Sequence, residues 1–204
     1  MCAEDVSSYD AIDLSTLGRA DRYKILTGAV VPRPIAFVTT LSLTGIVNAA
    51  PFSQFVIVAV DPGLLGISIG PSGRGPKDTL NNIRTSGEFV INMVPAHWAG
   101  VVQAASVEHP ADVSEVDLLG LDLLASSCVK PPRLAGSDIQ FECRTHTICE
   151  FGDAPNFFAI GAVVRMHVRQ GLAENSKIDP QRYRPLARIG GRNYVTMGKV
   201  ISIP

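Results

Sequence analysis

Apolar and polar positions alternate most clearly between Ile139 and Phe151. Odd-numbered residues there are apolar or Thr, and most even-numbered ones are Gln, Glu, Arg or His, which is the two-residue period of a strand with one buried face. Shorter apolar runs bounded by turn residues predict further strands at residues 35–40, 46–50, 54–60, 64–69, 89–94, 157–168 and 194–197. We therefore expect a chain dominated by β-strands.

Three segments predict short helices. Residues 15–26 form the first, and residues 96–106, with their spaced apolar side chains, form another. A helix between them begins at Lys77 or Asp78 and ends at Gly87, because glycine readily adopts the left-handed conformation that closes helices.

The remaining segments read as connections. Residues 108–117 are rich in acids and predict an exposed loop, and residues 179–191 form a polar, basic connection. Strands with peripheral helices favour a closed barrel, which leaves few sheet edges unpaired. The chain has no internal repeat or linker-like stretch, so residues 1–204 are expected to form a single domain with an N-terminal extension over about residues 1–20.

Composition narrows the class of function. The 18 Lys and Arg nearly balance the 19 Asp and Glu, which gives no electrostatic case for nucleic acid. The N-terminus lacks the features of an export signal, and no apolar run reaches the roughly 20 residues that span a bilayer, so we expect a cytoplasmic protein without a membrane segment. The four cysteines show no CxxC or Cys/His spacing of a metal site.

The Gly-rich segment at residues 70–79 is one candidate site. It is not a nucleoside triphosphate loop, because Pro76 precedes Lys77 and Asp78 stands where that motif needs a hydroxyl. Lys77, the Thr79 hydroxyl and the free N–H groups of a helix start can nevertheless hold one phosphate monoester. A plain turn followed by a helix cap, with Lys77 in solvent, explains the same residues.

A second candidate lies at residues 48–53. Asn48 can both donate to and accept from the pyrimidine edge of a flavin, and Ala49 and Ala50 allow the backbone to approach a ring closely. A simple turn is the alternative. The two segments together suit flavin mononucleotide (FMN), a polar aromatic ligand that carries one phosphate.

Other signals for chemistry are weak. The four histidines are scattered and form no nucleophile or metal pattern, so each is expected to be structural or solvated. No GxGxxG motif follows a strand, and a nicotinamide cofactor would therefore bind only transiently.

The order of several short motifs resembles the flavin reductase-like family, which includes flavoredoxin and the small reductase components of two-component flavin monooxygenases. The resemblance rests on residues 33–40 (Arg-Pro-Ile-Ala-Phe-Val-Thr-Thr), 48–53, 61–62, 77–79, 82–83 and 87–92, with further support from residues 131–134, 142–143, 185–191 and 194. Phe37 stands where the family often has Trp, so a stacking role there is not carried over.

The resemblance implies an FMN-binding split β-barrel, a homodimer with FMN near the subunit interface, and NADH or NADPH as transient co-substrate. A flavin-dependent monooxygenase is an expected partner. The residues implied along the flavin ring and ribityl chain are Thr39, Thr40, Asn48, Ala49, Ala50 and Ser53. Those implied toward the phosphate are Lys77, Asp78 and Thr79, with Arg33 and Arg188 as weaker candidates.

The activity expected on this basis is that of an NAD(P)H:flavin oxidoreductase. The hydride chemistry belongs to the flavin, so the protein positions the ring and needs no general acid or base. Backbone N–H groups around Ala49 and Ala50 are expected to stabilise charge on the reduced ring. An FMN-bound electron carrier, a substrate-specific flavoenzyme that does not use NAD(P)H, and a non-enzymatic scaffold barrel remain alternatives.

Overall fold

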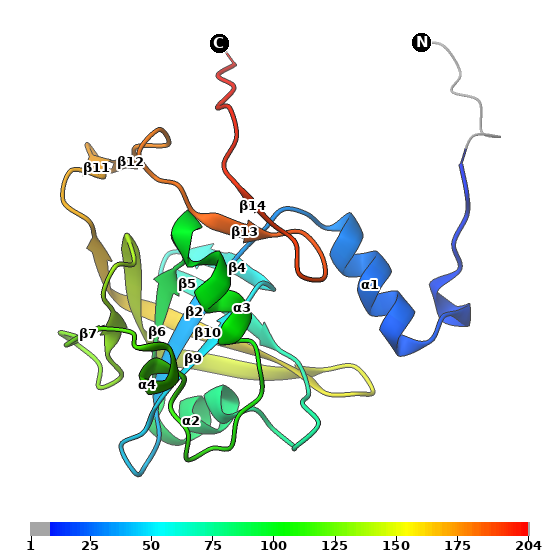
Figure 1. Ribbon diagram of the computed structural model, residues 1–204, viewed down its shortest axis with the longest axis horizontal. Coiled ribbons are helices and arrows are strands. Elements are labelled where there is room, and N and C mark those ends of the chain that lie inside the picture. The colour runs from blue at the N-terminus through cyan, green and yellow to red at the C-terminus, as the bar shows by residue number, and fades with distance from the viewer. Residues whose placement is uncertain (1–8, 204) are drawn as a thin grey trace.

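The structure, a computed structural model, describes residues 9–203. Its centre is a seven-stranded antiparallel sheet in the order β3-β2-β6-β9-β10-β5-β4 (Figure 1). The strands are β2 (Ala36–Leu41), β3 (Val47–Phe52), β4 (Phe55–Val60), β5 (Gly63–Ile69), β6 (Glu88–Met93), β9 (Ile139–Phe151) and β10 (Asn156–Val168). Each of these was predicted to within a few residues, because apolar runs bounded by turn residues mark them in the sequence.

Smaller sheets surround this one. A three-stranded sheet consists of β1 (Arg33–Pro34), β13 (Leu186–Arg188) and β14 (Tyr194–Thr196), and two-stranded sheets are formed by β7 (Leu123–Leu124) with β8 (Arg133–Leu134) and by β11 (Ala173–Glu174) with β12 (Lys177–Ile178). The strand predicted at residues 194–197 is thus confirmed as β14, and the basic connection before it contains β13.

The large sheet curls but does not close by strand pairing. Strands β3 and β4 are its two edges, although β3 and β5 contact each other across the fold. The free edge of β3 is taken by other groups: the Ser114 hydroxyl donates to the Val47 carbonyl at 2.7 Å, and Pro51 has no N–H to offer. The expectation of a fully closed barrel is therefore wrong, and the mainly β split barrel implied by the family resemblance is confirmed.

The helices are short. All but the first lie against the sheet, whereas the first projects away from it (Figure 1). The helices are α1 (Arg19–Ala29), α2 (Asp78–Ser86), α3 (Ala99–Ala104) and α4 (Glu115–Leu119), with 3-10 turns η2 (Leu14–Thr16) and η3 (Ala96–Trp98). The helix predicted at residues 15–26 is split, because the backbone is extended at Leu17 and Gly18. Among the described residues, none of the helices combines the length and the apolar character needed to cross a bilayer.

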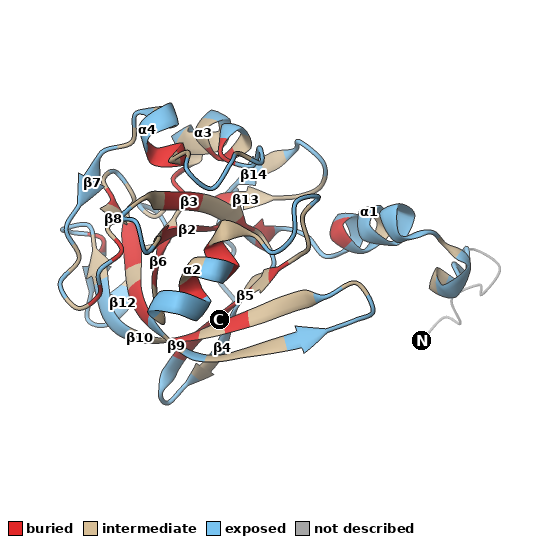
Figure 2. Ribbon diagram, turned by 90° about the horizontal axis from the view of Figure 1, so that it is seen from below, coloured by how far each residue is buried: buried red, intermediate tan, exposed pale blue. Residues whose placement is uncertain are grey.

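Two buried clusters hold the elements together (Figure 2). One fills the inside of the curled sheet around Phe89 and Ile67 and includes Leu80 and Ile83 of α2. The other packs η3, α3 and α4 against the opposite face of β2 around Phe37. Strand β2 is therefore buried on both faces.

Two expectations about polar residues are wrong. The acidic segment at residues 108–117 is not all exposed loop, because α4 begins at Glu115 and both Glu115 and Val116 are buried. The polar face of β9 is not all exposed either. Gln140 and Glu142 are buried because a loop and β8 cover them and supply hydrogen-bond donors.

Candidate functional site

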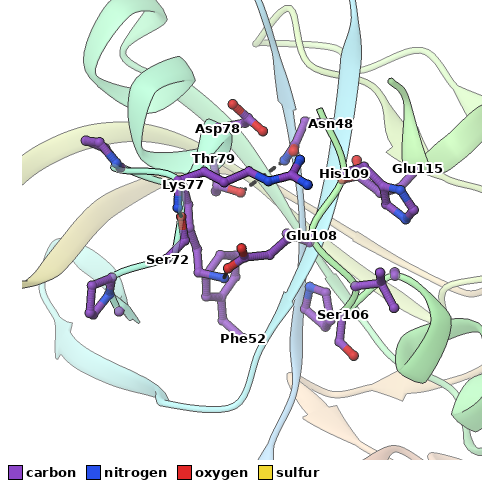
Figure 3. Close-up of a pocket in the computed structure, with 18 of the residues that line it drawn as sticks. Asn48, Phe52, Ser72, Lys77, Asp78, Thr79, Ser106, Glu108, His109 and Glu115 are labelled. Carbon is purple, nitrogen blue, oxygen red and sulfur yellow. Dashed lines mark hydrogen bonds and ion pairs between the residues drawn. The ribbon is translucent and has the colours of Figure 1, made fainter. Parts of the chain in front are cut away.

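A cavity of about 960 Å³ lies between the free edge of β3, the start of α2 and the loop at residues 105–111 (Figure 3). The residues on its wall that belong to the predicted site are Asn48, Ala50, Ser53, Lys77, Asp78 and Thr79. Segments 30 residues apart in the sequence thus meet around one space, and its volume is in the range of sites for small molecules and cofactors.

One end of the cavity is the N-terminus of α2. Lys77 precedes the helix in an extended conformation, and no side chain caps the helix, whose first turn therefore offers its N–H groups. The Lys77 ammonium lies 3.8 Å from a carboxylate oxygen of Glu108 on the facing loop. A cation beside the free N–H groups of a helix start is the arrangement that binds a phosphate group.

Asn48 connects β3 to this helix. Its Nδ2 donates to the Thr79 hydroxyl at 3.0 Å and lies 3.4 Å from the Thr40 hydroxyl. Asn82 of α2 also donates to Thr40, at 3.0 Å. Figure 3 shows Asn48 and Thr79 meeting at the cavity wall. The pair fixes where the helix start sits relative to the strand.

Thr39 and Thr40 do not line the cavity. Both are fully buried. Thr39 donates to the Pro132 carbonyl and accepts from Asn92, while Thr40 lies behind Asn48. Their register opposite Ala49 and Asn48 in β3 places them one strand inward, so they support the wall rather than form it.

Arg33 also lies behind the wall. Its Nε donates to the Ser53 hydroxyl at 3.4 Å, and Nη1 donates to the carbonyls of Thr27 and Val30 at the end of α1. Burial lowers the pKa of the Arg33 guanidinium, and the positive charge of Arg188, its cross-strand neighbour, acts in the same direction. Arg188 itself lines the cavity and is held by Tyr194.

The Ala49 backbone does not face a ligand as expected. Its N–H donates to Oε2 of Glu115 at 3.0 Å. Successive N–H groups of a strand point to opposite edges, so that of Ala50 is directed at β2 instead. The expected stabilisation of a reduced ring by these two N–H groups is therefore not supported, because the Ala49 N–H already donates to Glu115 and the Ala50 N–H faces β2.

Several wall residues were not anticipated from the sequence. Glu108, His109 and Glu115 come from the segment read as an exposed loop, and Arg19 and Tyr23 come from α1. The only signal for the first three was their place in an acid-rich stretch, and such stretches are usually solvated. Their position depends on how α3 and α4 pack on β2.

The fold and the site together define a class of protein: a split β-barrel with a polar cavity beside one of its edge strands. The flavin reductase-like domain model matches residues 28–192. The chain therefore belongs to the flavin reductase-like family, and at this level it is a flavin-related oxidoreductase.

Similar solved structures agree with this placement. Nitrilotriacetate monooxygenase component B from Bacillus cereus is 32% identical, with a TM-score of 0.92 over 96% of this chain and 99% of that one. The Pseudomonas fluorescens 2-nitrobenzoate 2-nitroreductase is 31% identical, with a TM-score of 0.87 over 96% and 95%. A putative flavin reductase with a split barrel domain from Shewanella frigidimarina is 21% identical, with a TM-score of 0.83 over 93% and 94%, and supports the fold alone.

Proposed function

We propose that this protein binds FMN in the cavity and catalyses its reduction by NADH or NADPH. The observation that carries the proposal is the uncapped N-terminus of α2, with Lys77 beside it and Thr79 fixed to Asn48, at one end of a cavity of about 960 Å³. One phosphate monoester satisfies those donors and the lysine charge.

The rest of the cavity suits the remainder of the molecule. From Asn48 to Ser53 the chain follows the cavity wall for about 16 Å at the usual rise per residue of a strand, long enough for a ring system and a polar chain. Ala50 and Ser53 leave room at the wall. Bound FMN would supply the hydride chemistry, and these residues would orient its ring and leave one face open to a nicotinamide.

The reduced flavin would serve a second protein. The likeness to component B of a nitrilotriacetate monooxygenase, over nearly the full length of both chains, supports a flavin-dependent monooxygenase as that partner. A different likeness favours a second candidate function. The similarity to a 2-nitrobenzoate 2-nitroreductase supports direct reduction of a small organic compound by the bound flavin.

We also propose that the protein is a homodimer. Strand β4 is an edge strand, and apolar residues on both of its faces are exposed, with Val56, Ile57, Val58 and Val60 all open to solvent. A contiguous apolar strand at an edge is a site of association. A second copy of the chain would cover it.

An anaerobic flavin titration tests the proposed activity. Protein freed of flavin is titrated with FMN, and the complex is then mixed with NADH or NADPH while its visible absorbance is followed. We expect FMN uptake and rapid bleaching with one nicotinamide. Uptake without bleaching would instead support the carrier or the substrate-specific reductase, and no uptake would contradict every flavin function.

A further inference from the structure

A second, smaller pocket lies against the large cavity. It has a volume of about 250 Å³ and is lined by Ala104, Ala105, Val107, His109, Glu115, Leu118 and Leu119. Ala105, Val107, His109 and Glu115 also line the large cavity. The two spaces therefore share a wall, and that wall carries both of the small pocket's titratable side chains.

The pocket has the size and surface of a site for one ring. An apolar cavity of about 150 Å³ is enough to bind benzene, so this pocket can hold a ring with one substituent. Its other five lining residues are all apolar. A ring seated there would direct a polar substituent toward His109 and Glu115, because only these two side chains offer polar atoms.

Glu115 is held firmly in this wall. It is 7% exposed, and its Oε2 accepts the Ala49 N–H at 3.0 Å. The preceding Ser114 fixes the start of α4 to β3 through the Val47 carbonyl. Among the described residues, Glu115 has no Lys, Arg or His within ion-pair distance, so no counter-ion in direct contact holds this carboxyl in its charged form.

The groups around Glu115 act on its protonation in opposite directions. Burial raises its pKa, as does the negative charge of Asp78 on α2. The hydrogen bond from Ala49 and the charge of His109 lower it, and the balance is a raised pKa. Figure 3 shows the His109 ring next to Glu115 at the cavity wall. A carboxyl of this kind can carry a proton at higher pH than an exposed one.

We propose that the small pocket binds a single-ring organic acceptor with a polarised C=O or N=O group, and that Glu115, coupled to His109, donates the proton for its reduction. The inference rests on the proposed flavin function. Bound, reduced flavin would supply a hydride to the electropositive atom of the acceptor. The π pair would then move to oxygen, and that oxygen would take the proton as the Glu115 O–H bond breaks. Glu115 would then regain a proton from solvent through the large cavity that it also lines.

Binding to the pocket can be tested without any flavin. Fluorine NMR measures saturable binding of para-fluorobenzaldehyde to the cofactor-free protein. Ala104→Phe fills the pocket and should abolish this binding, whereas Ala173→Phe, on the exposed strand β11, should leave it intact. Equal binding by both variants would overturn the assignment of the pocket.

The proton step is tested with flavin loaded and reduced by dithionite. Oxidation of the reduced flavin by para-fluorobenzaldehyde should be about 100-fold slower in Glu115→Gln than in the parent, in line with loss of a general acid. Oxidation of the reduced flavin by ferricyanide should be unchanged, because ferricyanide accepts electrons without taking up a proton. If the Gln variant does not fold, His109→Gln, which should raise the Glu115 pKa, should shift the pH dependence of the aldehyde rate to higher pH. Unchanged aldehyde rates would overturn the proton step alone, while failure to take up flavin would overturn both this step and the proposed function.

The coupling between the two side chains has a readout in the cofactor-free protein. Carbon NMR follows the titration of the Glu115 carboxyl. His109→Gln should raise the pKa of Glu115, because it removes a charge that lowers this pKa. Asp78→Asn should lower it, because it removes a charge that raises this pKa. No movement in either variant would contradict a coupled pair.

Discussion

At the scale of single residues, buried charges in this protein are satisfied mainly by backbone groups. Glu142, which is fully buried, accepts the N–H groups of residues 127–129 and contacts His167 at 2.6 Å. Arg33 donates to main-chain carbonyls, and Glu115 accepts a main-chain N–H. Each charge thereby fixes a loop or helix end to the sheet.

Removal of the Glu142 carboxyl should destabilise the fold strongly. Glu142→Ala leaves buried N–H groups and His167 without their acceptor, and we expect the free energy of unfolding to fall by about 3–5 kcal/mol. Denaturant unfolding measures the change. Glu150→Ala, an exposed position on the same strand, should stay within about 0.5 kcal/mol of the parent, and similar losses in both would contradict this role of Glu142.

The same carboxylate predicts a loss of stability in acid. Burial acts to raise the pKa of Glu142, but hydrogen bonds from Ser127, His167 and Cys128 hold it below its ordinary value of 4.5. Its contribution is therefore complete above about pH 4.5 and is lost as the pH falls toward the lower folded-state pKa. Stability measured against pH should fall less steeply over that acid range in Glu142→Gln than in the parent.

Lys77 should distinguish FMN from riboflavin, which lacks the phosphate. Lys77→Ala removes a charge-assisted contact of about 1.5–3 kcal/mol, or roughly 10- to 100-fold in FMN affinity, and should hardly affect riboflavin. Glu108→Gln removes the acid now near Lys77 and should tighten FMN binding. Titration by fluorescence measures the affinities of each variant for FMN and for riboflavin, with Lys177→Ala as the control. Equal losses for FMN and riboflavin would contradict the phosphate role.

At the scale of elements, the ends of the helices, more than their interiors, shape the candidate site. Helix α2 begins without a side-chain cap, which leaves its N–H groups at the cavity, and ends at Gly87 with φ of 69°. The edge of β3 that no strand pairs with contacts the start of α4 instead, through Glu115 and Ser114. The site forms where these two elements lack backbone partners of the regular kind.

Two glycines should respond to alanine in opposite ways. Gly87→Ala forces a Cβ into the left-handed region and should cost about 1–2 kcal/mol. Gly28→Ala lies within α1, meets no heavy atom within 4 Å, and should gain about 0.5–1 kcal/mol. Thermal unfolding should show shifts of opposite sign, and equal shifts would contradict this reading of the helix ends.

At the scale of the whole molecule, we expect the exposed edge strand β4 to decide the oligomeric state. Ile57 is 67% exposed on an edge strand. We expect Ile57→Glu to convert the proposed dimer into monomer, because it would bury a charge at the interface. Leu43→Glu, in the exposed turn between β2 and β3, should leave the dimer intact. Sedimentation velocity measures the outcome, and a parent chain that is already monomeric would overturn the proposal.

The sequence by itself determined the strand content, the helix at Lys77 to Gly87 and the family. Apolar runs, turn residues and an αL glycine are local signals, so they can be read before the chain folds. The sequence also predicted that residues 48–53 and the start of that helix belong to one site, and the structure brings Asn48 and Thr79 together at one cavity wall.

Only the tertiary structure decided what each wall residue does. Thr39 and Thr40 belong one strand inward because of the β2–β3 register, and the Ala49 N–H is taken by Glu115 from 66 residues away. An acid-rich stretch is normally solvated, and nothing local showed that packing of α4 on β3 would bury Glu115 beside His109. Burial and long-range contacts are properties of the folded chain, so the side chains that could move a proton were visible only there.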